Sequence, residues 1–367
     1  MRRSVSIAIQ RAMPLHRGEL MIFRQLFDSE SSTYTYVLAS RHGGEALIID
    51  PILDRVERYL QLLHELDLNL VKAIDTHIHA DHISGMGALR DRTHCVTVMG
   101  QETQADVVSI RVADGDNVDI EGLSLTAIHT PGHTPDSYSF LAGDRVFTGD
   151  TLLIRGTGRT DFQGGDARAQ YNSIFNKLLK LPDETLVYPA HDYKGETVSS
   201  IGEERAFNPR LKARSAEEYA AIMAELKLAN PKMMDVAVPK NVRVGLAQEK
   251  LLAEGFGIVA ADALALPSQP GVVLIDLRET RERQQHRAIA GALHAPYRDL
   301  AANVNPGGML FELSRATGRK LVFYCAFGER SAMAVQAAHA AGLTQASHIH
   351  GGIDAWKKAG GLTVECR

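Results

Sequence analysis

The sequence predicts an α/β protein of two domains, the second of them built on a parallel sheet. Its 367 residues exceed the length of one typical domain. From about residue 20 onwards, short runs rich in β-branched and aromatic residues alternate with amphipathic helical patterns. The apolar runs at 272–276 and 321–324 are typical of strands that are buried on both faces of a parallel sheet.

The first domain begins with two strands around the glycine turn at 42–44. A helix follows Asp54, which stands in a capping-box pattern with Glu57, and Ser215 with Glu218 forms a second such pattern. Strands are predicted at 34–39, 46–49, 71–74, 96–99, 123–129, 137–141, 145–148 and 186–188, and further helices at 84–90, 167–180 and 217–229.

The boundary between the domains is predicted near residue 250, because residues 230–245 hold two prolines and no clear period. The first domain then spans 20–250 and the second 251–367, with helices at 279–286, 331–341 and 353–359. Residues 1–19 carry four arginines and are expected to form a disordered extension.

Composition gives no reason to expect nucleic acid or a membrane as a partner. Hydrophobic residues make up 45% and charged residues 23%, with a net charge of −4, so nothing favours nucleic acid or an anionic membrane. No apolar stretch reaches the roughly 18 to 20 residues that span a bilayer. Three cysteines without paired spacing favour a reducing compartment, which predicts the cytoplasm. A homo-oligomer is compatible with this composition.

A dense group of metal-binding side chains follows the strand at 71–74. Three imidazoles and a carboxylate fall within residues 77–82, and further ligand types follow later strands or tight turns. Ligands carried by loops over a rigid sheet suit a preorganised metal site. The candidates are His77, His79, Asp81, His82, His133, Asp150 and His191.

This pattern, T-H-x-H-x-D-H followed by a histidine, an aspartate and a final histidine, resembles the metallo-β-lactamase superfamily, which implies an αββα sandwich. Residues 76–82, 158–163, 188–193 and 208–210 look most like its persulfide dioxygenase branch. The resemblance covers about residues 20–245. It implies one Fe(II) per chain, held by His77, His133 and Asp150, with open positions for O₂ and substrate.

The remaining candidates keep two interpretations open. His79, Asp81, His82 and His191 can orient the ligands and waters through hydrogen bonds. They can equally hold a second metal ion, as in glyoxalase II. Arg159, in a glycine-flanked loop, and Tyr193 are predicted to anchor the carboxylates of a glutathione-based substrate, and both match glutathione-binding positions of the family.

The second domain offers a cysteine after a buried strand. The loop C-x-x-G-x-R-S at 325–331, with residues 276–278 and 350–356, resembles a rhodanese over about residues 253–365. Cys325 is the predicted persulfide carrier, with Gly328 and Arg330 binding substrate. Loop N–H groups and a helix start predict a lowered thiol pKa. Glu329 stands where a second basic residue often sits, which weighs against a preference for thiosulfate.

The two motifs together predict Fe(II)-dependent oxidation of glutathione persulfide by O₂ to sulfite and glutathione. Through Cys325, the second domain would exchange sulfur between thiosulfate or sulfite and glutathione or its persulfide. Two alternatives remain: a dinuclear thioester hydrolase of the glyoxalase II kind with an appended sulfurtransferase, and a non-enzymatic persulfide carrier or sensor.

Overall fold

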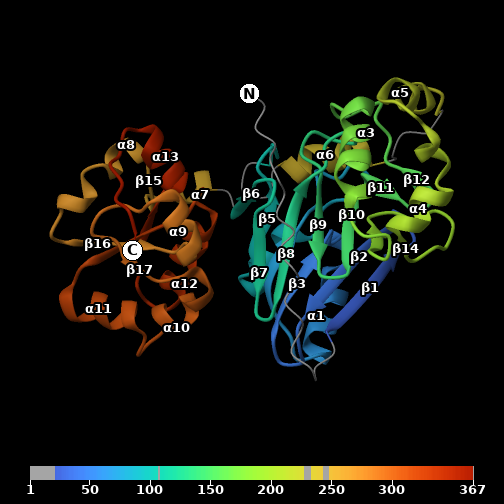
Figure 1. The fold of residues 1–367 in the computed structure, drawn as a ribbon. Coiled ribbons are helices and arrows are strands. Elements are labelled where there is room, and N and C mark those ends of the chain that lie inside the picture. The colour runs from blue at the N-terminus through green and yellow to red at the C-terminus, as the bar shows by residue number, and fades with distance from the viewer. Residues whose placement is uncertain (1–20, 106–107, 227–232, 243–247, 367) are drawn as a thin grey trace.

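The computed structural model describes residues 21–105, 108–226, 233–242 and 248–366, so the predicted extension at 1–19 lies outside the described residues. The chain forms two domains, one in blue to yellow and one in orange to red (Figure 1). Among the described residues, no helix is both long enough and apolar enough to cross a bilayer.

Two six-stranded sheets form the first domain. In the first sheet, β1, β2 and β3 pair antiparallel, and β3 to β6 pair parallel. Its strands are β1 (Ile22–Asp28), β2 (Thr33–Ala39), β3 (Glu45–Ile49), β4 (Asn69–Ile74), β5 (Val96–Gly100) and β6 (Ile110–Val112). The second sheet, in the order β14-β13-β10-β9-β8-β7, holds β7 (Asn117–Ile120), β8 (Leu123–His129), β9 (Tyr138–Ala142), β10 (Arg145–Gly149), β13 (Leu186–Pro189) and β14 (Ser199–Ser200). A small hairpin joins β11 (Leu152–Leu153) to β12 (Gly156–Thr157).

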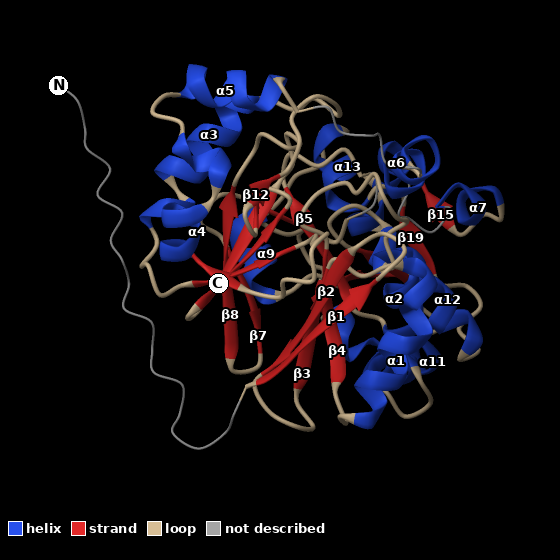
Figure 2. Ribbon diagram, turned by 90° about the vertical axis from the view of Figure 1, so that its right-hand side faces the viewer, coloured by secondary structure: helices blue, strands red, loops and turns tan. Residues whose placement is uncertain are grey.

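The two sheets face each other across an apolar core that includes Tyr36, Phe140 and Phe147. Helices cover the outer faces (Figure 2). On the first sheet lie α1 (Val56–Glu65) and α2 (Met86–Thr93); on the second lie α3 (Ala167–Asn176), α4 (Ile201–Phe207) and α5 (Ala216–Ala224). The αββα sandwich predicted from the sequence is therefore confirmed.

Local structure in the first domain differs from the prediction at several points. Strands β1, β6, β7, β11, β12 and β14 were not predicted, so the domain begins with β1 and not with the strand pair around the turn at 42–44. The chain enters α1 through a 3₁₀ turn at Leu53–Arg55, so Asp54 lies inside that turn and does not cap the helix. Helix α6 (Met234–Val242) forms within the region that showed no clear period, although Pro239 lies inside it. Part of the helix predicted at 217–229 lies outside the described residues.

The second domain holds a five-stranded sheet whose strands are all parallel. Its order is β15 (Gly257–Ile258), β19 (Ser347–Ile349), β18 (Lys320–Tyr324), β16 (Val272–Asp276) and β17 (Leu293–His294). Apolar clusters on both faces join it to the surrounding helices. These are α7 (Gln248–Ala253), α8 (Ala260–Ala263), α9 (Thr280–His286), α10 (Leu300–Val304), α11 (Met309–Thr317), α12 (Glu329–Ala340) and α13 (Gly352–Lys358). The predicted parallel sheet is confirmed.

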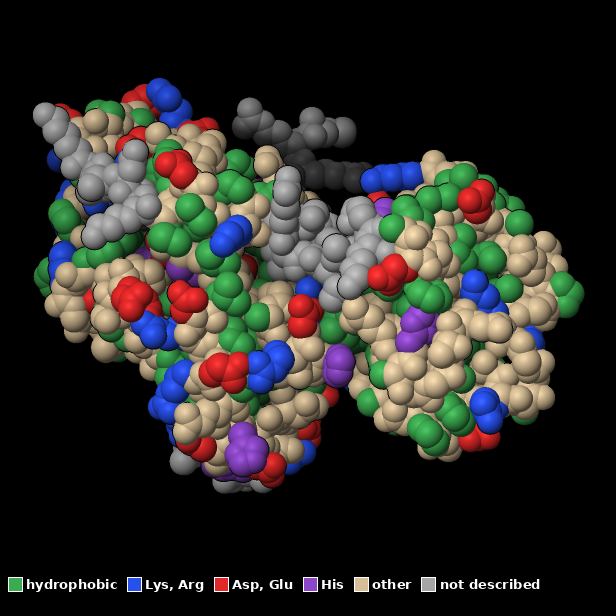
Figure 3. Space-filling view, turned by 180° about the vertical axis from the view of Figure 1, so that it is seen from behind, with side chains coloured by type: hydrophobic (Ala, Val, Ile, Leu, Met, Phe, Trp, Pro, Cys, Tyr) green, Lys and Arg blue, Asp and Glu red, His purple; other side chains and the backbone are tan. Residues whose placement is uncertain are grey.

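The edge of the first domain that carries β6 and β7 faces the second domain (Figure 1). Arg281 of α9 forms an ion pair with Asp119 of β7 at 3.1 Å. Arg330 of α12 donates to the Ser109 carbonyl, beside β6, at 3.0 Å. Seen from behind, the domains form two lobes with a groove between them (Figure 3).

Candidate metal centre and sulfur-transfer site

The metal-binding motif lies in the loop after β4. The carboxylate of Asp50, directly after β3, accepts hydrogen bonds from the Thr76 N–H (2.7 Å) and hydroxyl (3.0 Å), and it lies 3.2 Å from His79 Nε2. The carboxylate of Asp136 accepts from the Ile78 N–H at 3.2 Å. These bonds fix the loop, so its imidazoles are oriented by the fold itself.

His77, His133 and Asp150 converge at this edge, and their ligand atoms all lie within 4.8 Å of one another. His133 Nδ1 lies 2.8 Å from the Arg159 carbonyl and donates to it, so Nε2 is the nitrogen that faces Asp150 Oδ2, at 3.5 Å. His77 Nδ1 lies 2.9 Å from the Thr76 hydroxyl. One nitrogen of each imidazole is thus engaged by the protein while the ring offers a ligand atom to the cluster, as metal-binding histidines do.

The charge of this cluster fits a cation. Burial, and then the neighbouring imidazoles, lower the pKa of His77 well below its ordinary value, so the ring is neutral as a ligand must be. Burial opposes protonation of His191, yet the carboxylates of Asp150 and Asp81 raise its pKa to about 10. Asp150 Oδ1 is buried and accepts no hydrogen bond from any described residue. Such an oxygen is costly unless a cation binds it, so these residues fit a metal ion.

His79, Asp81 and His82 form a second cluster with ligand atoms within 4.8 Å of one another. Asp81 Oδ2 lies 2.8 Å from His82 Nδ1 and accepts from the Thr33 hydroxyl at 3.1 Å. His191 Nε2 lies between the clusters, 3.6 Å from Asp81 Oδ2 and 3.7 Å from an oxygen of Asp150. The structure therefore brings all the predicted ligands together, in an arrangement compatible with one ion or two.

A pocket of about 220 Å³ opens beside the metal centre, and both Arg159 and Tyr193 line it. The Tyr193 ring stacks on His191, with ring centroids 5.9 Å apart. The Arg159 guanidinium pairs with both carboxylate oxygens of Asp161, at 2.6 and 2.7 Å, and lies over the Phe162 ring. Phe162 and Arg210 also line the pocket. Both lie in segments that carry the family resemblance, 158–163 and 208–210, but neither was predicted to have a role.

A further residue of the metal centre that the sequence did not reveal is Asn241, on α6. Its buried side chain donates to the carbonyls of His79 (2.9 Å) and His82 (2.8 Å) and accepts from the Ser84 N–H (2.9 Å). Helix α6 therefore ties the metal loop to a segment far along the chain. The contact is non-local, which is why motif spacing could not predict it.

Replacing Asn241 with alanine is expected to destabilise the protein by about 1 to 3 kcal/mol, because buried carbonyls lose their donors. Metal retention should fall as well, since the loop loses its brace. Urea unfolding with metal analysis checks this. Asn176→Ala, which removes an exposed side-chain contact to Asn172, is the control. Equal unfolding midpoints for the two variants would show that Asn241 braces nothing.

Cys325 is the first residue after β18 and is fully buried. Its Sγ accepts a hydrogen bond from the Gly328 N–H at 3.1 Å. Gly328 adopts φ 104°, and a Cβ there would meet the Gln248 side chain at 2.1 Å, so only glycine fits the turn of this loop. The predicted curl of the loop toward the sulfur is present at Gly328.

The lowered thiol pKa that we predicted is wrong. Burial, and then the carboxylate of Glu329, raise the pKa of Cys325 to about 12. The Glu329 carboxylate turns inward, to 3.4 Å from Sγ, and its charge outweighs the loop N–H groups. Residue type alone did not indicate which way Glu329 points.

Arg330 does not line the groove beside this loop. Its buried guanidinium binds both carboxylate oxygens of Glu282, at 2.7 and 2.9 Å, and the Ser109 carbonyl of the first domain. The structure thus gives Arg330 a bracing position in place of the substrate contact that we predicted.

A cleft of about 730 Å³ lies between the domains. Ala326 and Phe327 line it, and both belong to the loop at 325–331, which we call the sulfur loop. None of its lining residues also lines the pocket at the metal centre. The two pockets are therefore separate.

Comparison with known protein families matches the two domains separately. The rhodanese-like domain model matches residues 259–359, and the metallo-beta-lactamase superfamily model matches residues 29–107 and 103–191. The mitochondrial persulfide dioxygenase ETHE1 of Homo sapiens is 45% identical over 232 residues, which are 62% of this chain and 91% of that protein. Its counterpart from Mus musculus is 44% identical over the same shares.

Solved structures agree. The crystal structure of ETHE1 from Myxococcus xanthus matches with a TM-score of 0.59 and 54% identity, over 60% of this chain and 98% of that one. A metallo-beta-lactamase structure from Staphylococcus aureus matches 90% of this chain and 99% of that one, with a TM-score of 0.58; at 22% identity it shows the fold alone. This chain belongs to the persulfide dioxygenase family of the metallo-β-lactamase superfamily, and it continues into a rhodanese-like domain.

Proposed function

We propose that the first domain oxidises glutathione persulfide with O₂ to sulfite and glutathione at one Fe(II) per chain. The second domain then moves sulfane sulfur through a persulfide on Cys325. The convergence of His77, His133 and Asp150, in a relative of persulfide dioxygenases, carries this proposal. His77, His133 and Asp150 would hold the ion with the ligand set of non-haem Fe(II) oxygenases, and an iron there would supply the redox chemistry with O₂.

Electron counting supports this reaction. Sulfane sulfur gives up four electrons on becoming sulfite, and O₂ accepts four. Glutathione persulfide, O₂ and water therefore yield glutathione, sulfite and two protons without an external reductant.

The chain's own residues supply binding and orientation. Asp50 and Asn241 hold the metal loop, and the carbonyl of Arg159 fixes the ring of His133. Arg159 and Tyr193 line the pocket beside the cluster, and a guanidinium and a phenol hydroxyl suit the carboxylates of a glutathione-based substrate.

One observation favours a second candidate function. His79 Nδ1 and His82 Nε2 are buried and have no hydrogen-bond partner among the described residues, as expected if they bound a second ion. A dinuclear centre held by these residues would supply the Lewis-acid chemistry for hydrolysis of a glutathione thioester such as S-lactoylglutathione. Metal content per chain, measured beside oxygen uptake, separates the two. Oxygen uptake also excludes a non-enzymatic persulfide carrier.

Arg159→Ala is expected to raise KM for glutathione persulfide and to lower kcat/KM. The loss corresponds to about 1.5 to 3 kcal/mol of substrate-binding free energy, because a charged hydrogen bond is lost. Iron content should stay normal. Steady-state oxygen uptake measures this, and Arg168→Ala, which removes an exposed arginine paired with Glu217, is the control. If Arg159→Ala and the control behave alike, the substrate is anchored by other residues.

For the second domain we propose thiosulfate, sulfite, glutathione and its persulfide as the exchanging partners, with neither nucleic acid nor a membrane involved. We place this exchange in the cytoplasm, because three cysteines without disulfides suit a reducing compartment.

A further inference from the structure

The sulfur-transfer site holds a carboxylate beside its nucleophile. Glu329 begins α12 and is fully buried. Its Oε2 lies 3.4 Å from Cys325 Sγ, where it can accept the thiol proton. Its Oε1 is also buried and accepts no hydrogen bond from any described residue; Arg330 Nε lies 3.5 Å away. A buried, under-bonded carboxylate aimed at a nucleophile is expensive for a fold to keep unless it has a role.

Of the charged and titratable groups near Cys325, Glu329 is the one whose position allows it to take the thiol proton. Arg330 on α12 is bound by Glu282 of α9. Tyr297 faces Glu329, and burial, then that carboxylate, raise the pKa of its hydroxyl. His348 of β19 contacts the Ser331 hydroxyl at 3.2 Å. Burial, and then His350, lower the pKa of His348 to about 4, so its ring is neutral.

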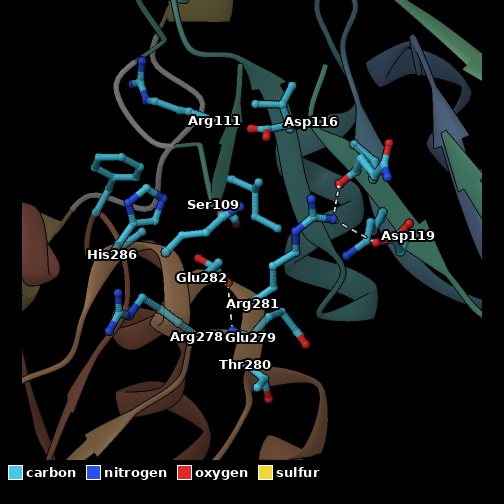
Figure 4. A pocket seen from close by; sticks show the side chains of 18 of the residues that line it. Ser109, Arg111, Asp116, Asp119, Arg278, Glu279, Thr280, Arg281, Glu282 and His286 are labelled. Carbon is cyan, nitrogen blue, oxygen red and sulfur yellow. Dashed lines mark hydrogen bonds and ion pairs between the residues drawn. The ribbon is translucent and has the colours of Figure 1, made fainter. Parts of the chain in front are cut away.

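The cleft beside the loop has room for a donor with an organic substituent. Its volume of about 730 Å³ is that of a small-molecule site. Ser109, Arg111 and Asp116 of the first domain face Glu282 and His286 of the second across it (Figure 4). The Arg111 guanidinium lies over the Phe327 ring of the sulfur loop, 5.1 Å from its centroid. The first domain therefore forms one wall of the cleft beside the sulfur loop.

We propose that Glu329 is the proton acceptor and donor of sulfur transfer, and that it makes the site prefer persulfides of small thiols over thiosulfate as the donor. This rests on the proposed role of Cys325. Sγ attacks the outer sulfur of R–S–SH; the Sγ–S bond forms as the R–S–S bond breaks. The Cys325 proton passes to Glu329, which then protonates the leaving thiolate. The balance is Cys–SH plus R–S–SH giving Cys–S–SH plus R–SH, with no net redox change.

The preference for persulfides over thiosulfate follows from the charge of the donor and from the leaving group that the donor releases. A thiolate leaves more easily when it receives a proton, and Glu329 can return one. Thiosulfate arrives as a dianion, which a buried carboxylate beside the sulfur repels. Sulfite, its leaving group, carries its charge away without needing that proton.

The test compares full-length Glu329→Gln with the parent, by the mass gain of one sulfur atom on Cys325 in rapid-quench mixing. With glutathione persulfide, loading should slow by roughly 100-fold or more. With thiosulfate it should hold or rise, so the donor preference reverses. The pH midpoint for alkylation of Cys325 should fall. Glu329→Asp should recover part of the loading rate, and Glu312→Gln, an exposed glutamate of α11, should match the parent.

Unchanged persulfide loading and unchanged donor preference in Glu329→Gln would overturn the proposal. Thermal unfolding followed by circular dichroism reports whether the second domain of each variant is folded. If Glu329→Gln fails to fold, Glu329→Asp decides, since loss of loading without a shift in donor preference contradicts the proposal. Failure of the parent itself to gain sulfur on Cys325 would instead contradict the proposed function of the domain.

Discussion

Asp150→Asn is expected to lose most of its iron and to slow oxygen uptake with glutathione persulfide on the order of 100-fold or more. The amide keeps the shape of the carboxylate but not its charge. Asp150 also has a buried oxygen without a hydrogen-bond donor among the described residues, which a cation would satisfy. Elemental analysis and an oxygen electrode measure the two effects.

Asp81→Asn is the matched control, because Asp81 belongs to the second cluster and already accepts from Thr33 and contacts His82. With one iron at His77, His133 and Asp150, Asp81→Asn should keep most of its iron. Equal metal loss in both variants, from a parent that holds two ions, would contradict the one-iron account.

Cys325→Ser is expected to abolish sulfur transfer with any donor, while oxygen uptake with added glutathione persulfide stays near the parental rate. A serine hydroxyl stays protonated near neutral pH and forms no persulfide. The metal-centre pocket and the interdomain cleft share no lining residue, so the first site has no structural need of the sulfur on Cys325. The measurement is oxygen uptake with two feeds, glutathione persulfide or thiosulfate plus glutathione.

Cys366→Ser, which changes a partly exposed thiol near the end of the chain, should keep both activities. Should direct persulfide oxidation collapse in Cys325→Ser while iron loading and folding stay intact, Cys325 would belong to the oxidation cycle itself.

Much of the fold was predictable because local pattern and tertiary role agree. The apolar strands β16 and β18 fall at the predicted ranges, with β18 one residue longer at its start. Helix α6 was missed because its pattern has no clear period and a proline lies inside it. The domain limits at 250 and 251 stay a prediction; α7 spans that point, and its Leu251 packs into the core of the second domain.

The candidate site was predictable where one segment supplies several ligands, as in the run from His77 to His82. Contacts that depend on the direction in which a side chain points were not predictable from the sequence. Asn241 reaches the metal loop from α6. Burial of Cys325, and then the carboxylate of Glu329 that turns toward it, raise the pKa of the thiol where a lowered pKa was expected. Arg330 likewise binds Glu282 and the first domain, which no loop motif could indicate.

The central claim is tested most directly by oxygen consumption of the iron-loaded full-length protein with glutathione persulfide, beside its metal content. The account predicts about one iron per chain, with one O₂ consumed and one sulfite formed for each persulfide. Two tightly bound zinc ions per chain, hydrolysis of S-lactoylglutathione and no oxygen uptake would contradict it.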